Sequence, residues 1–589
     1  MKRLLVKDLL WELDSVPFKT GQNGPEYAQW VRNDVVNIAK EFVQKNKLTE
    51  SCFVKGMNDV FKTTRFEILL KRWVVEYLKK LFSILDYFML YHSQLNKELV
   101  LEDVALNRLV VEKYYFRFGV SPKIKWRKRP NLLQKIFSIL LRSMVILRLS
   151  LNKGLKISGK REKYKVMREA IWGLHDINGY YFRDDFMVDE YKIKKEDILL
   201  FSRRIPAEAG KLKGRSKAYH DAKKSCYKHF NLQSLSLGIK PLFLRIIPKY
   251  IISGSKALFK EIFSGHFSLY WSVYSCFLYN ALLYEKVFSH FEIVSELGHN
   301  YFSTSCIVEA IICQNHGTKH YLMHWSDFSL PILKFQLSFL GCDGFLIWGN
   351  VHGQGIEIDP QILMPIGYVF KRFVKEVASN RNKILSDMGI DAKGKIISFF
   401  DESFGGTTAM TEENFVVFWR TILKVAQHEQ ANTIVVKPKG SSRYKLLSDE
   451  LKREFLEISD RILKMENIYV IDENKWSFIE AIGISDITVT QGMTSSATIA
   501  IVCGIEGLYL DQVGYEHPFA ELFKDKIVFD NPEKLVNMIH RIVIGKESPR
   551  KDIPERLLRE FDEYADDRGI DLFRDILSGS EVGVCQTKK

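Results

Sequence analysis

Small polar residues gather at the end of an apolar run in "ITVTQGMTSSATIAIVCGIEGLYLDQ", at 487–512. The pattern predicts a buried strand, a turn, a helix that begins near Ser495 or Ser496, and a second strand. Ligands of open parallel sheets bind beyond the carboxyl ends of the strands, where a helix N-terminus offers unpaired N–H groups to phosphate. Plain capping of the helix is the alternative, but it needs only one hydroxyl. We therefore expect a phosphate site made by Gln491, Gly492, Thr494, Ser495 and Ser496.

A second apolar strand ends in positive charge, in "VVKPKGSSRYK" at 435–445. The strand delivers Lys437 and Lys439 at its carboxyl end, with Pro438 between them and Gly440 after them. Two lysines beside a Gly-Ser-Ser turn suit a diphosphate or a nucleotide monophosphate. A solvated loop is the alternative.

A third strand runs into a glycine-containing turn, in "IISFFDESFGGTT" at 396–408. Glycine allows a ligand to approach the backbone closely, so Ser403 and Gly405 are candidates for contact with the same phosphate ligand. The pattern is not GxGxxG, and dinucleotide binding is not supported.

Histidines cluster in "QNHGTKHYLMHWSDF", at 314–328. His316 and His320 have the spacing of a helical metal pair, but Gly317 and the strand-like "HYLMHW" interrupt the helix. We therefore predict no metal site. A loop histidine at a strand end can act as a general base near neutral pH. A histidine without a functional role is the alternative.

Short apolar runs alternate with helical stretches from about residue 165 onward, which predicts parallel α/β sheets. One series of runs is "DILLFSR", "FEIVSEL", "KHYLMHW", "CDGFLIWG" and "LMPIGYV". The other is "KIISFF", "ANTIVVKPKG", "IYVIDE", "DITVTQG", "GLYLDQ" and "DKIVFD". We expect a mainly helical region at 1–165, Rossmann-like domains at 166–375 and 376–552, and a helical segment at 553–589.

The bulk properties narrow the class of protein. A chain of 589 residues is too long for one ordinary core, and its net charge of +15 suggests an anionic partner. The eight scattered cysteines form no CxxC pair, and the N-terminus becomes charged too soon for a signal peptide, which together favour a cytoplasmic location. The uncharged stretch at 263–284 is long enough to span a bilayer, but its Ser, Tyr, Asn and Trp content favours a buried or interfacial helix.

A basic cluster precedes a strongly apolar stretch at 131–150. Cations beside an apolar helical face are what a helix needs to lie on anionic lipid. An ordinary core helix with a solvated basic loop is an equal alternative, and no nucleic-acid motif accompanies the charge, so nucleic acid is not an expected partner. The predicted membrane contacts are Lys123, Lys125, Arg127, Lys128 and Arg129.

Together these motifs resemble GT-B-type glycosyltransferases, and among them bacterial surface-polysaccharide biosynthesis proteins, over roughly residues 190–580. "HGTK" at 316–319 is similar to the His-Gly-Thr element of CDP-glycerol glycerophosphotransferases. "VVKPKG" is similar to a strand end of those enzymes and of Kdo and sialic acid transferases, and "TQGMTSSATIAIVCGIEGLYLD" to their donor-phosphate turn. The sequence departs from the pattern where Lys439 and Gly440 replace His-Pro, where Asn315 precedes His316, and where Lys319 follows at once.

The resemblance implies two Rossmann-like domains facing a cleft, with a helical N-terminal extension. It implies an inverting, metal-independent glycosyltransferase without cofactor, which moves a sugar from a nucleotide donor to a glycan or lipid-linked glycan at the inner membrane face. His316 would be the base, with Asp327 or Glu309 as weaker candidates for base or orienting group. A polyol-phosphate transferase and a non-catalytic glycan- or nucleotide-binding assembly protein are the alternatives.

Overall fold

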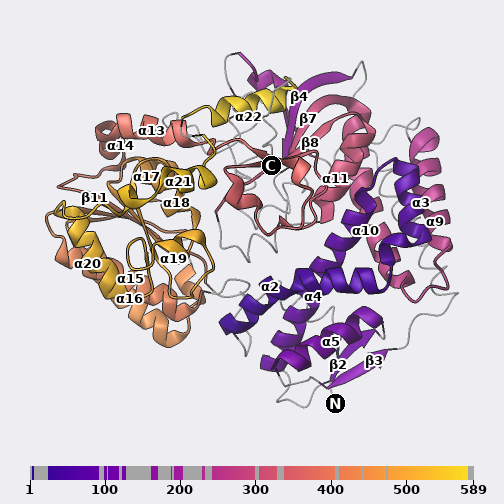
Figure 1. Cartoon of the computed structure of the whole chain (residues 1–589), viewed down its shortest axis with the longest axis horizontal. Helices are drawn as coiled ribbons and strands as arrows, with labels where there is room; N and C mark the ends of the chain where they lie inside the picture. Colours follow the sequence, from indigo (N-terminus) through magenta and orange to yellow (C-terminus); the bar gives the residue numbers. More distant parts are fainter. Residues whose placement is uncertain are drawn as a thin grey trace.

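The chain forms two parallel sheets covered by helices, joined to a mixed N-terminal region (Figure 1). The computed structural model describes residues 3–5, 24–91, 98–102, 104–118, 123–127, 161–169, 187–188, 191–202, 228–231, 242–298, 304–327, 337–404, 410–439, 443–472, 475–564 and 566–580.

The first sheet has seven parallel strands in the order β10-β9-β8-β7-β4-β5-β6. Its strands are β4 (Glu162–Glu169), β5 (Ile198–Ser202), β6 (Lys228–Asn231), β7 (Phe291–Gly298), β8 (Lys319–Met323), β9 (Gly344–Ile347) and β10 (Leu363–Pro365). The strand order reverses between β4 and β7, as in doubly wound folds. The expected boundary at residue 165 falls inside β4, so the first domain begins a few residues earlier.

The second sheet has six parallel strands in the order β13-β12-β11-β14-β15-β16, which in chain order is the Rossmann arrangement 3-2-1-4-5-6. Its strands are β11 (Ile396–Phe400), β12 (Thr433–Lys437), β13 (Ile468–Val470), β14 (Ile487–Gln491), β15 (Glu506–Leu510) and β16 (Val528–Phe529). Every residue of β11 and β14 is buried, as expected for strands covered on both faces. The predicted α/β class with two Rossmann-like sheets is confirmed.

Helices cover both sheets. The helices that lie between the strands of the first sheet in chain order are η4 (Lys195–Asp197), η6 (Leu242–Ser253), α9 (Gly254–Phe259), α10 (Phe267–His290), α11 (Thr304–Asn315), η7 (Asn350–Gly353) and η8 (Pro360–Ile362). The remaining ones are α13 (Lys371–Ser379), α14 (Arg381–Met388), α15 (Glu412–His428), η9 (Arg443–Leu446), α16 (Asp449–Leu463), α17 (Phe478–Gly483), α18 (Ser495–Val502), α19 (Pro518–Leu522), α20 (Pro532–Val543), η10 (Pro549–Asp552), α21 (Glu555–Phe561) and α22 (Gly569–Ser578).

The N-terminal region contains a small sheet as well as the expected helices. Its helices are α2 (Gly24–Lys45), η1 (Leu48–Glu50), α3 (Cys52–Phe61), α4 (Arg65–Tyr91) and α5 (Ala105–Phe118). Parallel strands β1 (Arg3–Leu5), β2 (Glu98–Glu102) and β3 (Ile124–Arg127) form the sheet, which the sequence analysis did not predict. The helices share one apolar core with α10 and α11, and the rings of Phe61 and Phe277 lie 5.0 Å apart. The region is therefore packed onto the first domain.

The uncharged stretch at 263–284 lies mostly in α10, which is buried along its length against α4, α9, α11 and β7. The helix is therefore buried against protein, which is one of the two placements that the sequence analysis favours. Within the described ranges, none of the helices combines the length and the apolar character needed to cross a membrane.

The C-terminal segment connects the two sheets. After α21 the chain returns to the first sheet, where α22 packs on β4 and β7 (Figure 1). The hydroxyl of Ser295 on β7 donates to the carbonyl oxygen of Leu577 at 2.6 Å. A single apolar cluster runs from β4 and β5 through α17 and α18 to Phe573, so the described part of the helical segment predicted at 553–589 belongs to the shared core.

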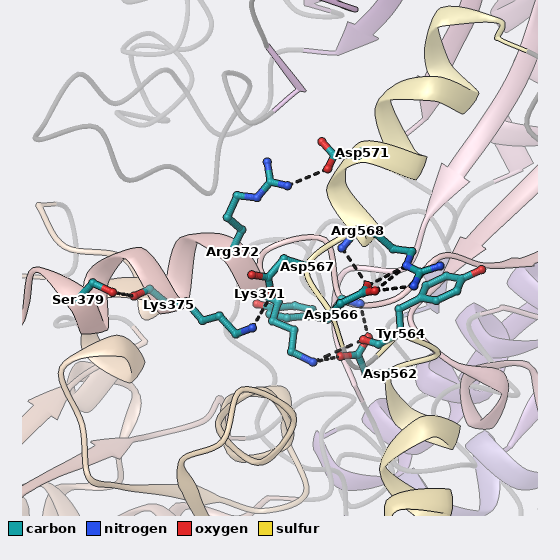
Figure 2. A network of polar contacts seen from close by, with 11 residues as sticks. Lys371, Arg372, Lys375, Ser379, Asp562, Tyr564, Asp566, Asp567, Arg568 and Asp571 are labelled. Atoms are coloured by element: carbon teal, nitrogen blue, oxygen red, sulfur yellow. Dashed lines mark hydrogen bonds and ion pairs between the residues drawn. The ribbon is translucent and has the colours of Figure 1, made fainter.

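Two lysines of α13 form ion pairs with this segment, and they differ in burial (Figure 2). Lys371 Nζ lies 2.7 Å from Asp562 with side chains 7% and 3% exposed, whereas Lys375 Nζ lies 2.7 Å from Asp567 with side chains 47% and 32% exposed. Lys371→Ala leaves a buried carboxylate without its cation, so we expect a loss of about 3–5 kcal/mol in the free energy of unfolding.

Lys375→Ala is the matched control, and it is expected to cost less than about 1 kcal/mol because its pair is solvent-exposed. Urea unfolding of both variants measures the difference. Similar losses from the two substitutions would contradict the claim that the buried pair holds the C-terminal segment in place.

Candidate functional site

Three of the predicted motifs converge at the carboxyl edge of the second sheet. Strands β11, β12 and β14 end at the same edge, and two hydrogen bonds link the turns that follow them. The Glu402 N–H donates to Gln491 Oε1 at 3.0 Å, and the Lys439 N–H donates to Asp401 Oδ1 at 2.5 Å. The order of the strands reverses between β11 and β14, which is where Rossmann-like sheets bind ligands.

The turn from β14 to α18 has the predicted form. The helix begins at Ser495 with Thr494 as N-cap, and the Thr494 side chain makes no capping hydrogen bond. Thr494, Ser495 and Ser496 are partly exposed, while Gln491 and Gly492 are buried. Gly492 adopts φ 66°, a left-handed conformation that favours glycine. The first-turn N–H groups and three accessible hydroxyls can therefore face an anion.

The cation next to this turn is already partly neutralised. Lys439 Nζ contacts the Glu402 carboxylate, which also accepts from the Ser403 N–H at 2.6 Å. The Lys439 side chain is 47% exposed, so a bound anion can compete with Glu402 for it. Lys437 is partly exposed at the end of β12. Gly405 and Gly440 lie outside the described residues.

His316 does not lie at this edge. It stands in the turn between α11 and β8, at the amino end of β8, so the length of the sheet separates it from the donor residues. Its Nε2 lies 3.3 Å from both carboxylate oxygens of Glu285, and its ring stacks on Phe288 at 4.3 Å. This position does not support the expected role as a base acting at the donor site. The sequence "HGTK" is similar to the family motif, but His316 precedes β8 and does not follow its carboxyl end.

His316→Ala is therefore expected to act on stability. The substitution removes the stacking on Phe288 and a contact to the fully buried Glu285 carboxylate, so we expect a loss of about 2–3 kcal/mol in the free energy of unfolding. Chemical denaturation checks this loss, and the nucleotide Kd measured in parallel should remain within about twofold of wild type. A variant with unchanged stability but no turnover would contradict this assignment.

Asp327 lies where the two sheets meet. One carboxylate oxygen accepts from the Thr498 hydroxyl and lies 3.1 Å from His517 Nε2, and the other lies 3.3 Å from His352 Nε2. The Phe519 N–H donates to Nδ1 of His517 at 3.1 Å, so His517 carries its proton on Nε2 and donates it to Asp327. Burial alone would raise the pKa of Asp327, but His517 and His352 outweigh it and hold that pKa far below its ordinary value.

The neighbouring Ser326 completes the contact between the sheets. Its hydroxyl lies 3.0 Å from the hydroxyl of Ser495 at the start of α18. The segment after β8 and the turn after β14 are thus in direct contact. Asp327 itself is buried and bonded to Thr498 and His517, so it positions these elements and does not contact His316.

His324 is the histidine at the carboxyl end of β8. Its ring lies 4.4 Å from that of His352, and both ring nitrogens are buried without a hydrogen-bond partner among the described residues. Burial, followed by the nearby His352, lowers the pKa of His324 well below its ordinary value, so the ring is neutral. A fully buried imidazole that resists protonation is not placed to take a proton from an acceptor hydroxyl.

Glu309 and the predicted membrane contacts lie elsewhere. Glu309 is buried on α11 beside Glu296 and His320, in the layer between the helix and the first sheet. Lys125 and Arg127 lie on the exposed positions of the strand β3, and the apolar stretch expected to form a helix at 131–150 lies outside the described residues. Lys123 precedes β3, and Lys128 and Arg129 lie outside the described residues.

Some residues at the junction carry no sequence signal. His352 and His517 belong to no recognisable motif, and only the fold brings them to Asp327. Arg168 is fully buried at the carboxyl end of β4, with its guanidinium 5.4 Å from the ring centre of Trp325. The sequence hardly indicates that this arginine is buried near the site, because the charged run "EKYKVMRE" is typical of a solvent-exposed segment.

Comparisons with known proteins give distant similarities. No family model and no curated protein matches the chain. The fold is similar to the wall teichoic acid polymerase TagF (9% identity, TM-score 0.43, covering 76% of this chain and 97% of that one) and to a glycosyltransferase from Rickettsia africae (11%, 0.39, 71% and 99%). It is also similar to UDP-GlcNAc 2-epimerase from Methanocaldococcus jannaschii (9%, 0.41, 71% and 100%). A likeness of this degree carries no argument about activity.

Proposed function

We propose that the chain is an inverting glycosyltransferase that holds a nucleotide-activated sugar at the carboxyl edge of the second sheet. The observation that carries the proposal is the convergence of three strand ends and the α18 N-terminus on one edge, in contact with the first sheet through Ser326 and Ser495. Donor contacts are assigned to Lys437, Lys439, Gly440, Gln491, Gly492, Thr494, Ser495, Ser496, Ser403 and Gly405.

The chemistry follows from these groups. An acceptor hydroxyl attacks the anomeric carbon of the sugar, the bond from that carbon to the diphosphate breaks, and the configuration inverts. The N–H groups of α18 and the Lys439 ammonium stabilise the charge that develops on the leaving diphosphate, and they do so without a metal. The hydroxyl proton passes to a base on the first sheet. That base is not His316, which lies at the opposite edge, and it is not His324, whose side chain is fully buried.

The acceptor proposed for this reaction is a glycan or lipid-linked glycan of a bacterial surface polysaccharide. Lys125 and Arg127 project from the exposed positions of β3, which supports contact with an anionic membrane surface. Alanine at both positions is expected to reduce binding to vesicles that contain anionic lipid and to leave the weak binding to neutral vesicles unchanged. Co-sedimentation measures both, and undiminished anionic binding would contradict this contact.

A turnover assay tests the function and separates it from its alternatives. The chain is incubated with nucleotide sugars or CDP-glycerol, with and without a lipid-linked glycan acceptor, and release of nucleotide is measured. Acceptor-dependent release from a nucleotide sugar supports the proposal. Release from CDP-glycerol alone would indicate a polyol-phosphate transferase, and nucleotide binding without turnover would indicate a binding protein. The turnover of His316→Ala should follow its folded fraction.

A further inference from the structure

Two histidines and a glutamate meet on the outer side of the second domain, where α15 packs against α20. His428 is the last residue of α15, Glu429 follows it, and His540 lies in the last turn of α20. The next strand, β12, begins at Thr433, so the cluster is near the amino edge of the sheet. The donor residues lie at the opposite edge, and the function proposed above makes no use of this cluster.

The three side chains already converge as metal ligands do. Glu429 Oε1 lies 2.8 Å from His540 Nδ1 and 3.3 Å from His428 Nδ1, and one ligand atom from each residue lies within 4.8 Å of the others. Tetrahedral zinc has bonds of about 2.0–2.1 Å, which places its ligand atoms roughly 3.3 Å apart. The two distances from Glu429 are already within about 0.5 Å of this value, and the two imidazole nitrogens, no more than 4.8 Å apart, would have to approach each other by at most about 1.5 Å.

The surroundings also fit a metal site. The Glu429 side chain is only 6% exposed, and its second oxygen accepts from the Asn432 side-chain amide at 3.0 Å, which fixes the direction of the carboxylate. Such an outer hydrogen bond is typical of carboxylates that bind metals. The His428 and His540 side chains are 50% and 42% exposed, so an ion has access and water can fill the remaining positions.

We propose that His428, Glu429 and His540 bind one divalent transition-metal cation of the zinc class. Two imidazole nitrogens and one carboxylate suit zinc, cobalt or nickel better than magnesium or calcium, which prefer oxygen ligands. The ion would link the end of α15 to the end of α20 and thereby stabilise the second domain. It has no part in the transfer reaction, since it lies at the other edge of the sheet.

Calorimetric titration of the full chain, without an affinity tag and stripped with a chelator, tests the site. We expect one equivalent of Zn²⁺ to bind, Co²⁺ to show the visible absorption of a tetrahedral site, and Mg²⁺ to show neither. His428→Ala and His540→Ala should each weaken binding at least about tenfold. His290→Ala, which removes another histidine at a helix end, should bind as wild type does.

Glu429→Gln provides a further variant that keeps the size of the side chain and removes the carboxylate ligand, and it should also weaken Zn²⁺ binding. Circular dichroism confirms that each variant is folded before titration. Absence of stoichiometric Zn²⁺ binding by the wild-type chain would overturn the proposal. Unchanged affinity in His428→Ala and His540→Ala would overturn it equally, because the ion would then be bound elsewhere.

Discussion

Asp327→Ala is expected to lower the free energy of unfolding by about 3–5 kcal/mol, as much as the loss of the buried Lys371. The substitution leaves the buried Nε2–H of His517 without its acceptor and removes the partner of the Thr498 hydroxyl. It also removes the Asp327 oxygen that lies 3.3 Å from His352 Nε2. Denaturant unfolding at neutral pH measures the loss.

The matched variant Asp327→Asn keeps the shape and one acceptor oxygen, so its loss should be clearly smaller than that of alanine. The pH dependence has a definite sign. Because the folded-state pKa of Asp327 is depressed, its stabilising contribution is complete above the unfolded pKa of about 4 and declines as the pH falls below that value. A loss of less than about 1 kcal/mol for Asp327→Ala would show that the network does not hold the sheets together.

Lys439→Ala is expected to raise the Kd of the preferred nucleoside diphosphate by at least about tenfold. The variant loses a charge-assisted hydrogen bond to the diphosphate, and it also leaves the Glu402 carboxylate without its cation beside an anionic ligand. Both changes raise the Kd. Isothermal titration with the nucleoside diphosphate measures the change.

Lys395→Ala is the control for this prediction. Lys395 stands immediately before β11, at the opposite edge of the same sheet, where its half-exposed ammonium pairs with Asp486 at 3.5 Å. Loss of this lysine changes the net charge by the same amount, so the Kd should change less than about twofold. An equal rise in Kd for the two variants would indicate a general electrostatic effect and not a site at the carboxyl edge.

The sheets were predictable because their strands are buried on both faces. Runs such as "IISFF" and "ITVT" are mainly apolar, contain no charged residue and are bounded by turn residues, so their position and type follow from the pattern. β4 was missed because "EKYKVMRE" mixes charged and apolar residues, although Val166, Met167 and Arg168 are fully buried. The small sheet of β1, β2 and β3 was missed because its strands, "RLL", "ELVLE" and "IKWR", mix charged and apolar residues and lie among helical stretches.

The candidate site was predictable on the donor side only. Strand ends at 401, 437 and 491 must meet at one edge of a parallel sheet, and the structure places them there. On the first sheet, the similarity of "HGTK" to a family motif favours His316 as the base, but the order of the elements places His316 at the wrong edge. The run "KHYLMHW" already placed His316 before its strand and His324 near the strand's end, which in a parallel sheet are opposite edges. The partners of Asp327 come from 352, 498 and 517, and no local pattern joins positions so distant in sequence.

The central claim is that the carboxyl edge of the second sheet binds the diphosphate of an activated donor, and thermal unfolding with CMP, CDP, UDP, GDP and dTDP tests it most directly. One of these nucleotides should raise the Tm of the wild-type chain by several degrees at about 100 times its Kd. The same concentration should produce a much smaller rise in Lys439→Ala and a full rise in Lys395→Ala. A chain whose Tm responds to none of the five nucleotides, or responds equally in both variants, would contradict the account.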